Sequence, residues 1–159
     1  MMITGAKTQI ESDMSDSLLE EMSEVVSFKI GTEEYAIDIL DVQEIIRMVE
    51  ITEVPKAPHY VEGVINLRGK VIPIVDLRLR FGLSAAERTK ESRIVMVDVG
   101  RIVIGLIVDS VSEVLRIPTS LIEPPPPSKG GGGAEFHKGV GRIDSRLLIL
   151  LDLQRLLGK

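Results

Sequence analysis

Two stretches of the chain alternate apolar and polar residues with the period of a half-buried β-strand. Residues 27–30 (SFKI) and 34–39 (EYAIDI) flank the sequence G-T-E-E, and this combination predicts a β-hairpin. Residues 94–99 (IVMVDV) and 102–109 (IVIGLIVD) flank a Gly-Arg pair in the same way, with both faces more apolar. We therefore expect one such hairpin in each half of the chain.

Two further hairpins are predicted nearer the end of each half. The first joins GVINLRG to KVIPIVDL (residues 63–77) and turns at residues 68–70. The second joins GVGRIDS to RLLILLDL (residues 139–153) and turns at residues 144–146. Asp76 and Asp152 follow the last strand of each hairpin and precede a short amphipathic stretch, so we expect each to cap the start of a helical turn.

These similarities reflect an internal duplication. The matching segments are residues 26–45 with 95–114, 51–55 with 121–125 and 63–82 with 139–158, at offsets of 69, 70 and 76 positions. The three matches keep their order, and the offset grows mainly inside the loop PPPPSKGGGG. We interpret the chain as two copies of one module, residues 25–83 and 92–158, with strands free to cross between them.

One segment of the first copy has helical spacing. In residues 41–48 (DVQEIIRM) and the following Val49, the apolar residues fall at positions 42, 45, 46 and 49, which predicts a helix. The β-branched residues of its counterpart, residues 110–117 (SVSEVLRI), fit either a helical turn or a strand. Each copy thus has four or five short strands, enough to close a small barrel. We predict an all-β fold with short helices, in which two small barrels pack together because neither is stable alone.

The composition excludes several kinds of chemistry. The 159 residues include no cysteine, which rules out disulfides, thiolate zinc sites and a cysteine nucleophile. His59 and His137 are far apart and lack the spacing of a helical metal site. Aromatic residues make up only 3% of the chain, so any core is aliphatic. We expect no metal, no cofactor and no enzymatic activity.

The charge is concentrated at the N-terminus. Residues 1–24 hold one lysine against six acidic residues, a net charge of −5, whereas the remaining residues are balanced. An acidic tail on a neutral body argues against nucleic-acid binding. We expect the tail to be flexible, or to form a short amphipathic helix over residues 16–25. Apolar runs are too short to span a membrane and no signal peptide is evident, so we expect a soluble, cytoplasmic protein.

The proline- and glycine-rich loop contains no recognisable catalytic or binding motif. GGGG at residues 130–133 lacks the Lys-Ser/Thr pair of a phosphate loop, and PPPP at residues 124–127 is better explained as a stiff spacer. One difference between the copies is more informative. Arg68 lies in a hairpin turn whose second-copy equivalent carries Asp144, and an arginine on a rigid hairpin suits recognition of carboxylate or carbonyl oxygens. An ordinary solvated arginine is the alternative.

Three motifs resemble the CheW family of bacterial chemotaxis coupling proteins: EEYAIDILDVQEII, GVINLRGKVIPIVDLR and GLIVDSVSEVL. The resemblance extends from about residue 25 to residue 157, and residues 63–78 are its most specific part. It implies two intertwined SH3-like, five-stranded barrels. It also implies a non-catalytic adaptor that links the cytoplasmic tips of methyl-accepting chemoreceptors to the regulatory domain of the histidine kinase CheA.

The resemblance further implies two sets of contact residues. The receptor-binding residues would be Asn66, Arg68, Val111 and Val114. The kinase-binding residues would be Val26, Ile39, Val42 and Glu44. We expect at least two of the three aliphatic kinase-binding residues to be exposed; the competing interpretation places them in the core.

The sequence departs from the family in the PPPPSKGGGG loop, which lacks an aromatic residue that relatives use in a second kinase contact. Phe136 could replace that residue from a shifted position, and Glu123 is a weaker candidate. Two other functions are compatible with the chain. One is a CheW-like scaffold in a related receptor–kinase pathway, such as twitching motility or development. The other is a small-ligand-binding barrel, which requires an apolar pocket with convergent polar groups.

Overall fold

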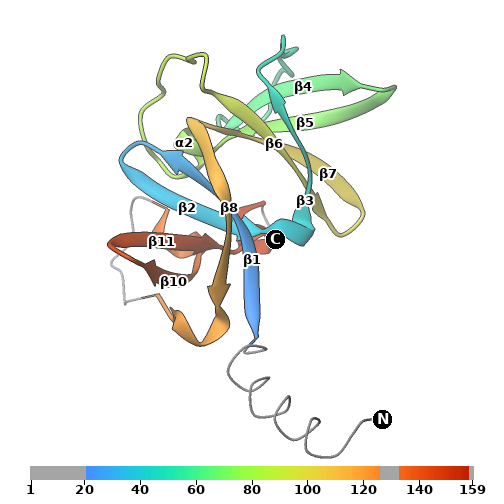
Figure 1. Ribbon diagram of the computed structural model, residues 1–159. Helices are drawn as coiled ribbons and strands as arrows, with labels where there is room; N and C mark the ends of the chain where they lie inside the picture. Colours follow the sequence, from blue (N-terminus) through green and yellow to red (C-terminus); the bar gives the residue numbers. More distant parts are fainter. Residues whose placement is uncertain (1–20, 126–132, 158–159) are drawn as a thin grey trace, which may run out of the picture.

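The computed structural model describes residues 21–125 and 133–157, which fold into two strongly twisted sheets (Figure 1). The strands are β1 (Met22–Ile30), β2 (Glu33–Asp38), β3 (Val42–Arg47), β4 (Val61–Leu67), β5 (Lys70–Asp76), β6 (Arg93–Val99), β7 (Ile102–Val108), β8 (Ser110–Pro118), β9 (Ile122–Glu123), β10 (His137–Ile143) and β11 (Arg146–Leu151). The helical segments are η1 (Ile39–Asp41), α2 (Leu77–Arg80), η2 (Thr119–Leu121), η3 (Ala134–Phe136) and α3 (Leu153–Leu156). The expected all-β fold with short helices is confirmed.

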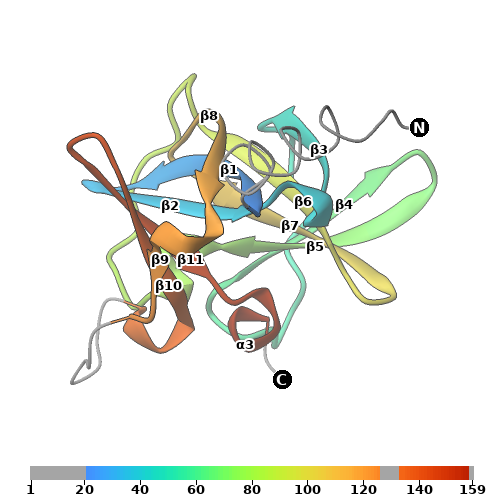
Figure 2. The same ribbon diagram turned by 60° about the horizontal axis from the view of Figure 1, so that its bottom comes forward.

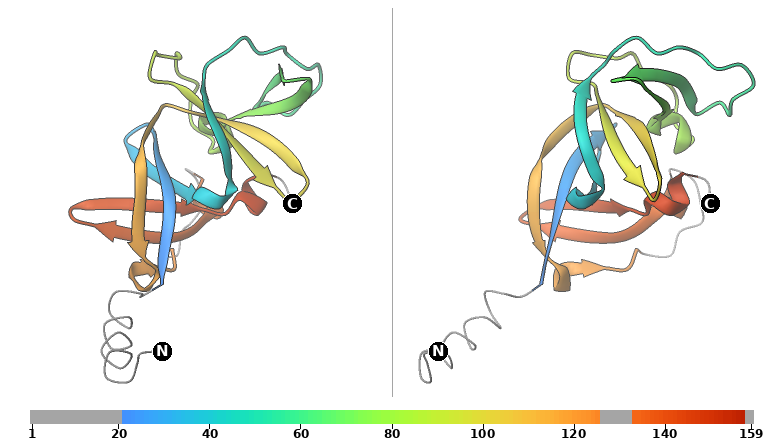
Figure 3. Two further views of the ribbon diagram at one scale, coloured as in Figure 1. Left: turned by 45° about the vertical axis from the view of Figure 1, so that its right-hand side comes forward. Right: turned by 90° about the vertical axis from the view of Figure 1, so that its right-hand side faces the viewer.

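Each sheet is mainly antiparallel and contains one parallel pair. The six-stranded sheet has the order β8-β1-β2-β11-β10-β9, and the five-stranded sheet has the order β3-β6-β7-β5-β4. The parallel pairs are β2 with β11 and β5 with β7, which occupy equivalent places in the two sheets. In both views of Figure 3, β8 (orange) runs beside β1 (blue).

The two copies exchange strands. The β1–β2 hairpin of the first copy joins β8 to β11 of the second copy, while the β6–β7 hairpin of the second copy joins β3 to β5 of the first. The sequence modules 25–83 and 92–158 therefore do not correspond to the two barrel-like sheets. The sequence repeat allowed strands to cross between the modules, and one hairpin of each module does so.

All four hairpins occur where the sequence pattern predicts them. The turns of the β4–β5 and β10–β11 hairpins begin at Arg68 (φ 53°) and Asp144 (φ 55°), so both turns place a non-glycine residue in the left-handed region. Gly63 and its equivalent Gly139 both lie where a neighbouring segment passes close to the backbone. A Cβ on Gly63 would lie 2.1 Å from the Thr52 carbonyl oxygen. The duplication thus extends to backbone detail.

The helix predicted over residues 41–48 is wrong. Residues 39–41 form η1, and Val42–Arg47 form strand β3, which pairs with β6. The physical reason is that valine and isoleucine favour a strand wherever a partner strand is available. The counterpart, β8, is also a strand.

The N-terminal boundary also differs from the expectation. β1 begins at Met22, and Glu21 already accepts a backbone hydrogen bond from Thr119 (2.8 Å). Residues 22–25 therefore belong to the sheet, and a helix running to Val25 is excluded. The rest of the predicted tail, residues 1–20, lies outside the described residues.

A hydrophobic core extends through both sheets; it is mostly aliphatic, but Phe28, Tyr35, Phe81 and Phe136 are buried in it, so the expectation of a purely aliphatic core is wrong. Its largest cluster includes Phe28 of β1, Leu106 of β7, Leu77 of α2 and Leu156 of α3, each 0% exposed. As predicted, Asp76 and Asp152 cap α2 and α3: Asp76 accepts from the backbone N–H of Arg78 (2.9 Å). Figure 2 shows α3 at one end of the β10–β11 hairpin, near the C-terminus.

A single arginine links the two helical ends. The Arg80 guanidinium lies between the rings of Tyr60 (4.4 Å) and Phe136 (4.5 Å), and its Nε donates to the Leu156 carbonyl (2.7 Å). Because Arg80 lies near the end of the first copy and Leu156 near the end of the second, this contact joins the ends of the two copies by cation–π and hydrogen-bond interactions.

Candidate functional site

The β4–β5 hairpin presents two of the expected receptor-binding residues at its tip. Asn66 and Arg68 are both exposed. The Asn66 side-chain oxygen accepts a hydrogen bond from the Gly69 backbone N–H (3.2 Å), which helps to fix the two-residue turn. Asn66 therefore stabilises the turn that carries Arg68.

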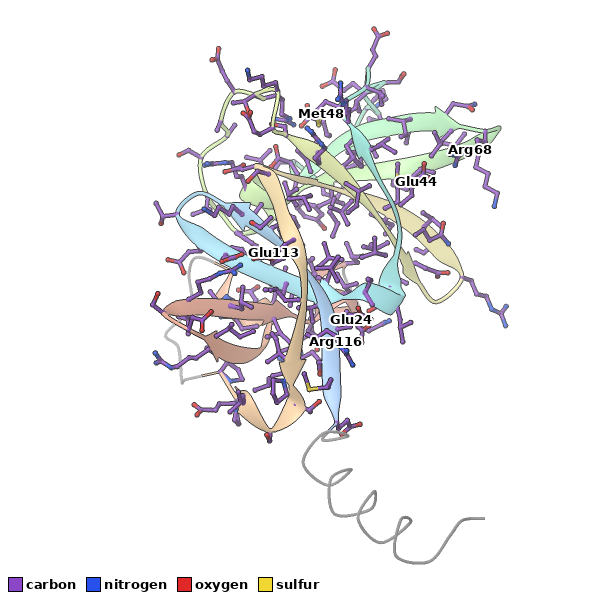
Figure 4. All side chains as sticks on the ribbon, viewed as in Figure 1. Glu24, Glu44, Met48, Arg68, Glu113 and Arg116 are labelled. Atoms are coloured by element: carbon purple, nitrogen blue, oxygen red, sulfur yellow. The ribbon has the colours of Figure 1, made fainter. Side chains whose placement is uncertain are left out.

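Arg68 forms a bidentate ion pair with Glu44 of β3 (Figure 4). Both guanidinium–carboxylate distances are 2.8 Å. The hydrogen bond from Arg68 lowers the pKa of Glu44, so the pair is intact above the ordinary glutamate pKa and is lost as the pH falls through the lowered value. The structure thus joins a residue expected to face the receptor to one expected to face the kinase.

The expected kinase-binding residues are less exposed than predicted. Val26 is only 2% exposed, and residues 25–28 of β1 are all buried, so both faces of this part of the strand are covered. Ile39 and Val42 are partly buried, and Val42 packs against the main core cluster. The expectation that at least two of the three would be exposed is wrong, and Val26 is a core residue.

Two exposed aliphatic residues next to this set were missed. Leu40 in η1 is 87% exposed and Ile45 in β3 is 39% exposed. The helix predicted for this segment placed Ile45 on the buried face with Val42. Strand alternation, counted from the partly buried Val42, Glu44 and Ile46, would have turned Ile45 outward.

The other two expected receptor-binding residues lie on β8. Val114 is 51% exposed, whereas Val111 is partly buried against the main core. In Figure 4, Glu113 and Arg116, which flank Val114, are well separated from Arg68. The four residues therefore do not form one continuous cluster: two occupy the hairpin tip of the five-stranded sheet and two occupy β8 of the six-stranded sheet.

Phe136 cannot serve as an aromatic contact for a partner. It is 4% exposed and packs against Phe81, with ring centres 6.1 Å apart. Glu123 is exposed on β9, where it pairs with Val140. Most of the PPPPSKGGGG loop, residues 126–132, lies outside the described residues.

Two small cavities adjoin the ends of β2 and β11. One, of about 200 Å³, is lined by four aspartates and Lys138, and burial followed by the charge of Asp38 raises the pKa of Asp41. The other, of about 260 Å³, is mainly apolar, with Ser23, Thr119 and Lys138 at its border. Both are below the roughly 300 Å³ of a typical ligand site, but a hollow of about 510 Å³ beside β5 and β7 and another of about 410 Å³ beside the β1–β2 turn exceed it. In the part of the chain that the structure describes, no side chains are grouped to hold a metal ion.

Comparison with known families places these features in context. The CheW-like domain matches residues 24–159, which include both sheets. The chain belongs to the CheW-like family. The match begins within β1 and covers both copies of the repeat, so the family domain is the complete exchanged pair of sheets rather than one copy.

Named CheW proteins are similar over most of their length. The chemotaxis protein CheW of Rhizobium meliloti is 40% identical over 130 residues, which are 82% of this chain and 84% of the relative. CheW of Thermotoga maritima is 37% identical over 144 residues, 91% of this chain and 92% of the relative. The crystal structure of the scaffolding protein TtCheW from Thermoanaerobacter tengcongensis superposes with a TM-score of 0.80 at 41% identity, covering 86% of this chain and 93% of that one.

None of the helices in residues 21–125 and 133–157 is long and apolar enough to cross a membrane.

Proposed function

We propose that this CheW-like protein is a non-catalytic adaptor that couples methyl-accepting chemoreceptors to the histidine kinase CheA in the cytoplasm. The observation that carries the proposal is the match of both sheets to the CheW-like domain, together with similarity to a protein described as a scaffold. No cofactor or metal is part of the proposed activity.

The proposed kinase-binding surface is centred on η1 and β3. It comprises Ile39, Val42 and Glu44, to which we add the exposed Leu40 and Ile45. An aliphatic centre bordered by charged residues suits a specific and reversible interface. Val26 is left out because its side chain is buried.

The proposed receptor-binding surface has two parts, Asn66 with Arg68 and Val111 with Val114. A receptor tip that contacts both parts must extend across both sheets. Val114 supplies exposed apolar area, and the polar hairpin tip supplies hydrogen-bonding groups. A scaffold in a related receptor–kinase pathway would use the same surfaces with different partners.

The direct test is binding of the full chain to the purified regulatory domain of a CheA kinase from the same genome. We expect saturable binding, lost in Leu40→Glu, because a charge replaces an 87% exposed aliphatic residue at the centre of the proposed surface. Leu121→Glu is the matched control, since Leu121 is 50% exposed in η2, outside both proposed surfaces.

Each outcome has a defined meaning. Binding that Leu40→Glu abolishes and Leu121→Glu preserves supports the proposed kinase surface. Absence of binding by the unaltered chain to any such kinase domain would reject the chemotaxis assignment. Binding to the kinase of a related pathway would then support the alternative scaffold function.

A further inference from the structure

Arg146, at the start of β11, links three strands of the six-stranded sheet. Its Nε and Nη2 donate to Glu34 of β2 at 3.2 and 2.5 Å, and its Nη1 donates to Glu113 of β8 at 2.6 Å. These hydrogen bonds lower the pKa of Glu34, with burial acting in the opposite direction. A fork of parallel donors holding two carboxylates gives a geometry that a point charge cannot reproduce.

The same arrangement occurs, in altered form, in the other sheet. Glu113 is the repeat equivalent of Glu44, and each is held by an arginine from the hairpin that completes its own sheet. The arginine has moved: the equivalent of Arg68 is Asp144, and Arg146 lies two residues further on. Both copies therefore have an ion pair at the equivalent acidic position, Glu44 or Glu113, but the arginine that forms it lies at a different position in each copy.

Each of these acids follows a β-bulge. On β8, Glu113 pairs with Ser27 and Val111 with Phe28, so Ser112 is the extra residue. On β3, Glu44 pairs with Met96 and Val42 with Val97, so Gln43 is extra. A bulge rotates the residues that follow it and so sets which side chain faces outward. The next residues, Val114 and Ile45, are both exposed aliphatics.

β8 depends on this contact more than an interior strand would. It is an edge strand, paired with β1 alone. In the described residues, Glu113 is the one residue of β8 that forms an ion pair. Figure 4 shows Glu113 on β8, close above Arg116 along the strand. The Ser27 hydroxyl holds the backbone of Glu113 from β1, donating to its carbonyl (3.2 Å) and accepting from its N–H (3.3 Å). Arg146 holds the Glu113 side chain, and the two contacts together fix the bulge beside Val114.

The two arginines differ in what they leave available to a partner. Arg68 has one acidic partner and its side chain is 71% exposed, whereas Arg146 has two and is 33% exposed. The difference follows from Glu34, whose repeat equivalent is the apolar Val103. With its donors directed at two carboxylates, Arg146 is suited to hold β8 in place rather than to contact a partner itself.

We propose that Arg146 is a positioning residue for the receptor-binding surface, acting through Glu113 to hold the bulge of β8 and the outward orientation of Val114. This inference rests on the proposed function, because it assigns Arg146 to the receptor part of the site. The proposal predicts that weakening the Arg146–Glu113 contact lowers receptor affinity and leaves the affinity for the kinase, which binds at β3, unchanged.

The test compares three variants of the full chain in binding to a soluble receptor-tip fragment and to the CheA regulatory domain. Glu113→Gln removes the negative charge from the β8 half of the contact and leaves Glu34 paired with Arg146. Arg146→Lys keeps the charge but loses the fork. Glu24→Gln is the matched control, an exposed acid on β1 paired in register with Arg116 of β8.

We expect Glu113→Gln and Arg146→Lys each to weaken receptor binding by roughly fivefold, with no further loss in the double variant, because both act on one contact. Kinase binding should stay unchanged in both variants. The melting temperature should stay unchanged in Glu113→Gln but fall in Arg146→Lys, which also weakens the pair with the largely buried Glu34. Every property of Glu24→Gln should stay unchanged. Amide exchange of Val111–Val114 should accelerate in the first two variants, a readout that needs no partner.

The outcomes separate this inference from the proposed function. If the unaltered chain does not bind the receptor fragment, the proposed receptor role fails and this inference fails with it. If the unaltered chain binds but Arg146→Lys binds equally well, Arg146 has no positioning role. Equal losses of receptor binding, kinase binding and melting temperature would show a merely structural contact, and loss in Glu113→Gln alone would make Glu113 a direct contact.

Discussion

The Arg68–Glu44 ion pair changes how a substitution at either residue should be interpreted. Arg68→Ala removes a side chain that is 71% exposed, and surface ion pairs contribute little to stability, so the melting temperature should not change. It also frees the Glu44 carboxylate beside the proposed kinase surface. We therefore expect Arg68→Ala to alter kinase binding as well as receptor binding, measured by titration calorimetry with each partner.

Glu44→Gln provides the comparison for this prediction. If Arg68 acts only by holding Glu44, the two variants will have the same effect on both partners. A loss of receptor binding in Arg68→Ala that Glu44→Gln does not reproduce would identify a direct contact by the guanidinium. Kinase binding that neither variant alters would contradict the predicted coupling.

We expect His137 to make the stability of the protein depend on pH. Its Nε2 is buried without a hydrogen-bond partner, its ring packs against Tyr35 at 6.3 Å, and burial lowers its pKa below 6.5. The folded state therefore disfavours the charged imidazole, and stability should fall as the pH drops below about 6.5 toward the lowered pKa.

His137→Leu should reduce this dependence, because leucine cannot be protonated. The measurement is the urea midpoint of the unaltered protein and of His137→Leu between about pH 7.5 and pH 5, a range that spans the ordinary histidine pKa. The two curves should diverge as the pH falls, with the His137→Leu midpoint declining less. Parallel curves would assign the pH dependence to other groups.

At the scale of single residues, the sequence could not determine exposure. Alternation shows that Val26 and Phe28 share one face of a strand, but it cannot show which face lies inside, and both sides of β1 are covered by neighbours. The Arg68–Glu44 pair was also beyond reach, since its members are 24 positions apart on different strands.

The two helix caps allow a matched comparison of elements. Asp76 is 2% exposed, caps α2 through Arg78 and Leu79, and forms an ion pair with Arg88 at 3.2 Å. Its equivalent Asp152 caps α3 through Arg155 (3.2 Å), and its side chain is 31% exposed. The buried cap has more interactions to lose.

We therefore expect Asp76→Ala to lower the free energy of unfolding by about 2–4 kcal/mol and Asp152→Ala by about 1 kcal/mol. Urea denaturation of the two variants tests the difference. Asp76→Asn is the control for capping, because asparagine can accept the same backbone hydrogen bonds but carries no charge for Arg88. Equal losses in both alanine variants would contradict the importance of burial.

The elements themselves were largely predictable from the sequence, with one instructive failure. Turn residues and alternation located all four hairpins, and the aspartates marked α2 and α3. β3 was mistaken for a helix because Val42, Ile45, Ile46 and Val49 have a spacing that fits a helix face. The strand does alternate, but its period is hidden in the sequence because an acid, Glu44, occupies a partly buried position and an aliphatic residue, Ile45, occupies an exposed one.

For the whole molecule, strand exchange implies that the two copies depend on each other. The β1–β2 hairpin has its partners in β8 and β11, and the β6–β7 hairpin has its partners in β3 and β5. We expect fragments 1–91 and 92–159 to be unfolded when expressed separately and to form the native sheets when mixed. Circular dichroism of each fragment and of the mixture tests this.

Intact protein should correspondingly unfold in one transition, as two sheets with a common core cannot melt independently. Native-like near-ultraviolet signal from either fragment alone would contradict the prediction. The duplication was evident in the sequence, but the exchange was not, because equivalent strands of two copies are interchangeable partners as far as their apolar pattern is concerned.

The exchange also has a consequence for synthesis on the ribosome. Chains generally fold N-terminal parts first as they emerge, but here the β1–β2 hairpin must wait for β11, the last strand of the described residues to leave the exit tunnel. Until then its apolar face has no native partner. The growing polypeptide is therefore exposed to aggregation and proteolysis until β11 has emerged, and only then can both halves reach their native state together.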